Sequence, residues 1–312
     1  MKNIITPIDR ELLVNELNQD RFLRKTNYGN KKIYIVTAHD SPNTMREIGR
    51  LREISFRDAG GGSGLDCDLD KYDISENPYK QLIVWDPAEQ EIVGGYRFID
   101  GCNIGKDDDG TPASATAKLF HFGEEFVEKY LPITIELGRS FVQPKYQPTF
   151  NIRKGMFSLD NLWDGLGALT VDYPNIKYFF GKITMYPSFN VTARDCILFF
   201  MQKYFPDEKR MVYPHEAVHV VTSKEELNSI FTGNSYDEDY KILVKTVRQL
   251  GESIPPLVNA YMNLSSTMKM FGTAINRTFG EVEETGILVN IDDIYETKKH
   301  RHISTYQPKS GK

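Results

Sequence analysis

Strand-like and helix-like segments alternate along most of this chain, and that order constrains the fold more than any single motif. Runs rich in β-branched and aromatic residues predict strands at 32–37, 81–85, 91–99, 132–142 and 178–185. Apolar residues at helical spacing predict helices at 45–56, 159–170 and 190–204. A strand-then-helix order of this kind favours an α/β fold, with one mixed central sheet flanked by helices.

The alternating pattern weakens around Phe205, and we place a domain boundary there. Residues 1–205 are predicted to form the main domain, and residues 206–312 a smaller, mostly helical extension packed on that core. Within the extension we expect helices near 224–231, 237–250 and 256–270 and a short strand at 286–291. Two further helices are predicted at 8–24 and 120–130.

Composition excludes several classes of protein. The formal net charge of −5 argues against a general nucleic-acid binder, which needs a clustered excess of Lys and Arg. Three widely separated cysteines favour a reducing, cytoplasmic compartment over a disulfide framework. The first residues lack the apolar core of a signal peptide, and no run approaches the roughly 18 apolar residues of a membrane span.

The segment Glu136-Leu-Gly-Arg139 is the most informative local feature. A carboxylate within an otherwise apolar strand costs free energy unless it is paired, and Arg139 is the candidate partner of Glu136. Residues three apart point to opposite faces of a regular strand, so the two can share a site only across a bulge near Gly138. A structural ion pair at a sheet edge would explain the same residues.

Further charged residues suggest that this strand faces a pocket. Arg52 and Phe56 are four apart and therefore share one face of the predicted helix. Asp70 and Asp73 follow a glycine-rich loop at 59–64, and Arg97 lies in a Tyr-Arg-Phe strand segment. Two or more arginines beside several carboxylates would form a charged cluster, although an acidic run alone is more often a solvated loop.

In this order, the patterns Arg-x3-Phe, Asp-x2-Asp, Tyr-Arg-Phe and Glu-x-x-Arg resemble the acyl-homoserine-lactone synthases and the N-acyltransferases of ornithine-lipid synthesis, which belong to the GNAT superfamily. The segments 136–142, 162–167 and 178–184 are similar to the hemolysin-like branch, and most of all to the glycine-lipid N-acyltransferases. The resemblance is clearest over residues 45–205. It implies that a charged cluster lies beside the amine acceptor, formed by Arg52, Asp70, Asp73, Arg97, Glu136 and Arg139. Phe56 would pack there, and the loop 59–64 would close over the acceptor.

The same resemblance places the acyl donor along Phe141 and Val142 and beside the loop that contains Arg153, Lys154 and Gly155. Many GNAT enzymes carry a glycine-rich pyrophosphate loop at this point, whereas this loop has two cations and one glycine. A single phosphate, as on the phosphopantetheine arm of acyl carrier protein, suits such a loop better than free coenzyme A. The tyrosine that often protonates the leaving thiolate is not evident, and Tyr186 is a stand-in.

The string His215-Glu-Ala-Val-His219 matches the HExxH pattern of zinc proteases. That chemistry requires both histidines on one helix face, but Pro214 and the surrounding valines favour extended chain. The basic segment 298–302 is usually a solvated end, and it would also suit an anionic membrane surface. We therefore expect no metal site, and peripheral membrane contact at most.

Taken together, the sequence predicts an acyltransferase that needs no tightly bound cofactor. Glu136 would act as the base, directly or through a water, and Arg52, Arg97 or Arg139 would hold the carboxylate of a small amino-acid acceptor. The resemblance favours glycine as acceptor and a 3-hydroxyacyl thioester of acyl carrier protein as donor, with ornithine as the alternative acceptor. A non-catalytic GNAT-like or hemolysin-like binding protein is the alternative from another class.

Overall fold

One large mixed sheet organises the chain, and residues 1–308 are described by the computed structural model. Its strands run in the order β1-β2-β3-β4-β6-β7-β10-β9. The strands are β1 (Phe22–Lys25), β2 (Lys32–Val36), β3 (Lys80–Asp86), β4 (Glu91–Asp100), β6 (Thr134–Val142), β7 (Tyr178–Met185), β9 (Lys269–Asn276) and β10 (Val282–Asn290). Only the β6–β7 pair is parallel, and the remaining neighbours are antiparallel. The expected mixed α/β sheet is confirmed.

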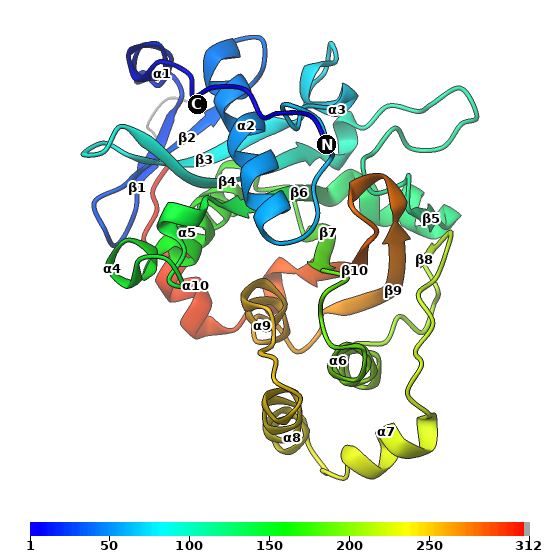
Figure 1. Ribbon diagram of the computed structural model, residues 1–312. Coiled ribbons are helices and arrows are strands. Elements are labelled where there is room, and N and C mark those ends of the chain that lie inside the picture. Colours follow the sequence, from blue (N-terminus) through cyan, green and yellow to red (C-terminus); the bar gives the residue numbers. More distant parts are fainter. Residues whose placement is uncertain (309–312) are drawn as a thin grey trace.

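Helices cover both faces of this sheet (Figure 1). Their bounds are α1 (Arg10–Glu16), α2 (Pro42–Asp58), α3 (Lys71–Ile74), α4 (Ile152–Gly155), α5 (Ser158–Asp172), α6 (Val191–Tyr204), α7 (Lys224–Ile230), α8 (Tyr236–Gln249), α9 (Pro256–Met262) and α10 (Glu296–His302). One face packs against α5, α6 and α9, and the other against α1 and α2. None of the helices in residues 1–308 is long and apolar enough to cross a membrane.

The helix α2 illustrates how the sequence determines an element. Pro42 occupies the first turn, where its missing N–H costs nothing and its fixed φ suits a helix. Met45, Ile48 and Leu51 follow at helical spacing, and all three are buried against β2 and β3. Arg52, the residue after Leu51, is buried on the same side of the helix and faces the sheet.

The segment between β4 and β6 covers the rest of the sheet face on which α2 packs. It contains β5 (Phe120–Phe122), which pairs with β8 (Val212–Pro214), and a π-helical turn at Phe126–Tyr130. Phe120 and Phe126 pack there on Phe180 of β7. The predicted helix at 120–130 is therefore wrong in its first turn, because β8 pairs with that segment.

Two other expectations about local structure were also wrong. The helix predicted at 8–24 ends at Glu16, and Phe22–Lys25 instead forms the edge strand β1 on β2. The helix predicted at 256–270 ends at Met262, and β9 begins at Lys269 because β10 pairs with it. Strands from beyond the boundary placed at residue 205 thus extend the central sheet, while α7 and α8 project away from it (Figure 1).

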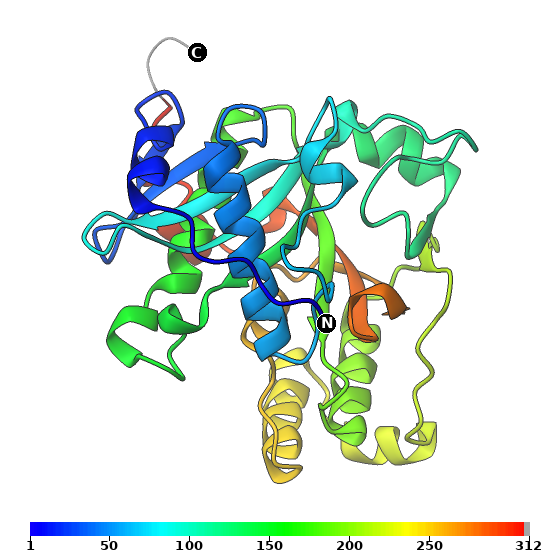
Figure 2. The ribbon, with the colours of Figure 1, turned by 45° about the horizontal axis from the view of Figure 1, so that its top comes forward.

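The first residues lie along α2 rather than apart from it (Figure 2). Lys2 N–H donates to the Gly64 carbonyl at 2.8 Å, and Ile5 N–H donates to the Asp66 carbonyl at 3.0 Å. At the other end, His302 of α10 is buried and its Nδ1 lies 2.8 Å from Asp164 Oδ1. The basic segment 298–302 is therefore in part a packed helix on α5.

Candidate active site

A bulge interrupts β6 where the sequence predicted one. Gly138 pairs with Arg97 of β4, and Phe141 pairs with Gly95, so three steps along β6 oppose two along β4. Arg139 takes up the extra residue with φ +48°, a left-handed conformation that is uncommon outside glycine. The regular alternation of side chains is broken there. The predicted interruption near Gly138 is confirmed, and Arg139 is its centre.

β6 also separates from β7 at the same level. Their parallel pairing extends from Thr134–Tyr178 to Glu136–Phe180 and is not recorded beyond it in the described residues. Gly181 faces the point of separation, where an added Cβ would lie 2.8 Å from the Leu137 carbonyl oxygen. The sheet therefore opens between β6 and β7 just after Glu136.

Arg52 is the most deeply buried arginine of the charged cluster. Its side chain is fully buried, and Nη1 lies 3.2 Å from both carboxylate oxygens of Asp73. Nη2 donates to Oε1 of Gln81 on β3, a partner that the sequence analysis missed. Because Arg52 has no exposed surface, it supports the site from within the fold.

Arg97 connects the two aspartates of α3. Its Nη1 lies 2.8 Å from Asp70 Oδ2 and 3.3 Å from Asp73 Oδ2. The aspartates are fixed by the helix start, because Asp70 accepts from Tyr72 N–H and Asp73 accepts from Asp70 N–H. Burial opposes the charged form of Asp73, but Arg52 and Arg97 outweigh it and lower its pKa to about 2.

Arg139 completes the cluster from the bulge. Its Nε forms an ion pair with Asp68 Oδ2 at 2.9 Å, and its Nη2 lies 3.8 Å from Asp70 Oδ2. The guanidinium sits 4.1 Å from the ring centre of Phe279 and 6.0 Å from that of Phe56. Asp68 and Phe279 were missed, since nothing in their local sequence distinguishes them from loop residues.

Glu136 is buried beside this cluster but does not pair with Arg139, so the expected ion pair is wrong. Its Oε1 accepts from the N–H and the hydroxyl of Thr116, at 3.0 and 2.7 Å. Its Oε2 is buried and has no hydrogen-bond partner within residues 1–308. Burial and the Glu136 charge raise the pKa of the neighbouring Tyr79 well above its usual value.

The charges of the cluster balance without Glu136. Three arginines are matched by three aspartates, in the pairs Arg52–Asp73, Arg97–Asp70, Arg97–Asp73 and Arg139–Asp68. Glu136 therefore adds a negative charge that no ion pair among the described residues compensates. A buried carboxylate with one open oxygen is suited to bind an ammonium group or to accept a proton.

The glycine-rich loop 59–64 is tied to α2 at the rim of the site. Glu53 is fully buried, and its Oε2 accepts from Ser63 N–H at 3.0 Å while Oε1 accepts from Gly64 N–H at 2.8 Å. An added Cβ on Gly61 would lie 3.1 Å from the Tyr186 ring. The loop thus packs beside Tyr186, the residue that follows β7. Near the same end of α2, Phe56 packs edge-to-face on Phe279.

The two apolar residues predicted to contact the donor lie on opposite faces of β6. Phe141 is buried among the α2-side core residues, whereas Val142 is partly buried among those on the α5 side. Both follow the point where β6 leaves β7.

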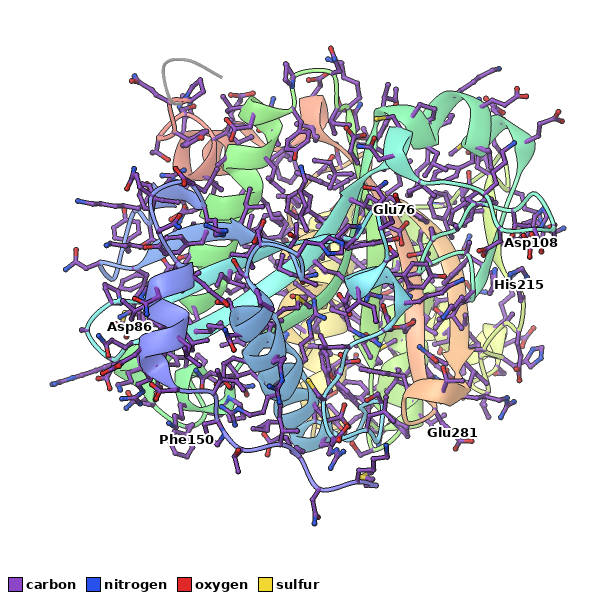
Figure 3. The ribbon with its side chains drawn as sticks, turned by 90° about the horizontal axis from the view of Figure 1, so that it is seen from above. Glu76, Asp86, Asp108, Phe150, His215 and Glu281 are labelled. Carbon is purple, nitrogen blue, oxygen red and sulfur yellow. The ribbon has the colours of Figure 1, made fainter. Side chains whose placement is uncertain are left out.

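The predicted donor loop forms the short helix α4, capped by Asn151, whose side chain accepts from Lys154 N–H. Arg153 is exposed, and Lys154 pairs with Glu89 at 2.9 Å. Gly155 is required, because an added Cβ would lie 2.3 Å from the Pro148 nitrogen. Phe150, just before the helix, is 73% exposed and lies at the edge of the molecule (Figure 3).

The HExxH string does not form a helix, which confirms the extended conformation predicted for it. Ala217 bridges to Ala274 of β9, and His215 Nε2 lies 3.0 Å from the Ala117 carbonyl oxygen. Figure 3 shows His215 on the opposite side of the molecule from Asp86. Within residues 1–308, no group of three or more His, Cys, Asp or Glu side chains could hold a metal ion.

Comparison with known proteins identifies the family. Residues 51–153 match the acetyltransferase (GNAT) domain, a span that begins within α2 and includes β3, β4 and β6. The chain is 58% identical to a glycine N(alpha)-acyltransferase of Bacteroides thetaiotaomicron over 306 residues, covering 98% of this chain and 91% of that protein. This chain belongs to that family. A second glycine N(alpha)-acyltransferase, from Phocaeicola vulgatus, is 56% identical and covers 98% and 94% of the two chains. The chain is accordingly an acyltransferase with a GNAT-like fold, as predicted.

Two solved structures overlap this fold more loosely. FeeM, an N-acyl amino acid synthase from uncultured soil microbes, is 9% identical over 85% of this chain and 94% of its own, with a TM-score of 0.39. The CoA-dependent acyl-homoserine lactone synthase BjaI is 10% identical over 88% of this chain and 86% of its own, with a TM-score of 0.39.

Proposed function

We propose that this chain transfers a 3-hydroxyfatty acyl group from the thioester of acyl carrier protein to the α-amine of glycine. The names of the two relatives support glycine as the acceptor. The observation that carries the proposal is Glu136, a buried carboxylate whose Oε2 has no hydrogen-bond partner among the described residues, at the point where β6 and β7 separate. Such a group has the chemistry that N-acylation requires of its base.

Glu136 is proposed to bind the acceptor ammonium and remove one proton, directly or through a water. The free amine then attacks the thioester carbonyl, forming a C–N bond and an oxyanion. Backbone N–H groups of β6 beyond its pairing with β7 are available to stabilise that oxyanion. Collapse of the intermediate breaks the C–S bond and releases the thiolate, and the second proton of the attacking nitrogen passes to the thiolate or to water, which leaves a neutral amide.

The leaving thiolate needs little assistance, because an ordinary thiol has a pKa of about 8.5. Tyr186 at the rim of the loop 59–64 is the candidate that would assist it. Burial and Glu284 raise the pKa of Tyr186 to about 12, so its hydroxyl is protonated at neutral pH and would assist the thiolate chiefly by donating a hydrogen bond, the full proton coming from water. A proton taken by Glu136 returns to solvent or to the thiolate at the end of the cycle.

The donor is proposed to lie along the separated part of β6. Phe141 and Val142 are apolar residues on its two faces, so an acyl chain would run past one of them, and the exposed Arg153 offers a cation to a single phosphate such as that of phosphopantetheine. No tightly bound cofactor takes part in this reaction. The product would be an N-acylglycine, an amphiphile that enters glycine-lipid synthesis and partitions to a membrane surface, where peripheral contact would deliver it.

The test is incubation of the purified chain with 3-hydroxypalmitoyl-acyl carrier protein and single amino acids, followed by mass spectrometry of the products. We expect N-(3-hydroxypalmitoyl)glycine. The absence of any N-acyl amino acid would refute the proposed reaction. Preference for ornithine over glycine would correct the acceptor alone, and equal use of 3-hydroxypalmitoyl-CoA would correct the donor alone.

A further inference from the structure

The acceptor carboxylate has no evident partner among the cluster arginines. Arg52 is fully buried, and the side chains of Arg97 and Arg139 are 4% and 16% exposed. All three are engaged by Asp68, Asp70 or Asp73. An amino-acid carboxylate placed against these pairs would compete with aspartates that are already in position, so a further cation is needed.

One lysine near Glu136 meets that need. Lys118 is exposed, and its Nζ lies 4.9 Å from the ring centre of Tyr72. No carboxylate within residues 1–308 lies within ion-pair distance of it, although it is close enough to Asp70, Arg97 and Arg139 to experience their charges. Lys182, another lysine on this face, is 3.2 Å from Glu284 and is thereby neutralised.

The backbone fixes Lys118 relative to Glu136. Thr116, two residues before the lysine, donates both its N–H and its hydroxyl to Glu136. Phe120, two residues after it, is buried in β5. The short segment between these anchors therefore ties the backbone of Lys118 to the residue that holds the Glu136 carboxylate. Burial lowers the pKa of Lys118, Asp70 opposes this shift, and the cations Lys71, Arg97 and Arg139 lower the pKa further.

We propose that Lys118 binds the carboxylate of the acceptor amino acid while Glu136 binds its ammonium group. This inference rests on the proposed function and extends it to acceptor recognition. A zwitterionic α-amino acid presents its two charges on adjacent carbons, so a carboxylate on one side and a lysine on the other recognise both ends. Simple amines and amino-acid amides satisfy only the Glu136 side.

The test compares wild type, Lys118→Met and Lys118→Arg with glycine and with glycinamide, using 3-hydroxypalmitoyl-acyl carrier protein as donor. Methionine keeps the apolar stem over Tyr72 and removes the charge. We expect Lys118→Met to raise the KM for glycine about 10- to 100-fold, as for loss of one charge-assisted hydrogen bond. The preference for glycine over glycinamide should fall by the same factor, and Lys118→Arg should restore much of it.

Lys71→Met is the matched control. Lys71 also lies over the Tyr72 ring, at 5.2 Å, but it pairs with Asp107 at 3.3 Å and should leave both KM values unchanged. An unchanged glycine KM and preference in Lys118→Met would overturn the inference while the proposed reaction stands. A raised KM for the thioester alone would assign Lys118 to the donor and also overturn it. A wild type that acylates neither acceptor would refute the reaction and this inference together.

Discussion

Replacing Glu136 by glutamine isolates the proposed base. Glutamine keeps the shape of the side chain, and its Oε1 can still accept from both the N–H and the hydroxyl of Thr116. The change weakens those bonds and adds a buried NH2 group, but it also removes a buried charge that has no counter-ion. These effects oppose one another, so we expect the free energy of unfolding to change by about 1 kcal/mol or less.

The effect on turnover should be far larger. General-base catalysis contributes about 10²- to 10⁴-fold, so Glu136→Gln should lose about 3 to 5 kcal/mol of transition-state stabilisation. The assay is the initial rate of N-acylglycine formation with saturating thioester. Because the base is needed only while the amine carries its extra proton, the gap between variant and wild type should narrow as pH rises.

Glu284→Gln provides the control for this experiment. Glu284 is also a buried carboxylate on the same face of the sheet, but it is paired with Lys182. We expect this variant to retain most of the rate. A Glu136→Gln enzyme with the wild-type rate, or with a rate deficit independent of pH, would refute the assignment of Glu136 as base.

Three further outcomes follow from the same contacts. Thr116→Val removes the hydroxyl that donates to Glu136 at 2.7 Å. This variant should lower kcat several-fold with little change in the thioester KM. An unchanged kcat would show that other groups position Glu136. Arg52→Met leaves the fully buried Asp73 with only Arg97 as its cation. Urea unfolding should show that the free energy of unfolding falls by about 3 to 5 kcal/mol. A loss below about 1 kcal/mol would contradict the stabilising role assigned to the Arg52–Asp73 ion pair. Because the pKa of Asp73 is lowered to about 2 in the fold, its stabilising contribution is complete above the unfolded value near 4 and disappears as pH falls through that interval. An Asp73→Asn variant should therefore show a flatter loss of stability between pH 5 and 2, measured by urea titration at each pH.

The sequence predicts the central strands well because their residues carry the pattern themselves. β-branched and aromatic runs mark β2, β3, β4, β6 and β7, and helical spacing marks α2 and α5. It fails for β1 and β9, which depend on their neighbours. Phe22–Lys25 is only four residues long and is held by pairing with β2, and Lys269–Asn276 follows a helix with no clear break in hydrophobicity.

The candidate site divides in the same way. Glu136 and Arg139 are recognisable as charged residues within an apolar strand. Because the strand period is two, they can reach one site only across a bulge. The actual partners, Thr116 for Glu136 and Asp68 for Arg139, are not visible in the sequence, because both lie in loop segments that only the folded chain brings to β6. Thr116 ends the polar, Asp- and Gly-rich segment 103–116, a composition typical of an exposed loop, yet its side chain is buried.

The conformation of Arg139 shows why these features belong together. A non-glycine residue at φ +48° costs of the order of 1 kcal/mol, and glycine would remove that cost. Glycine would also remove the guanidinium that neutralises Asp68, where burial already raises the carboxyl pKa. The strained arginine thus contributes a bulge in β6 and a counter-charge to the aspartates. Because the three arginines are committed in this way, the substrate roles proposed above fall on charged residues outside the arginine–aspartate pairs, Glu136 for the ammonium group and Lys118 for the carboxylate.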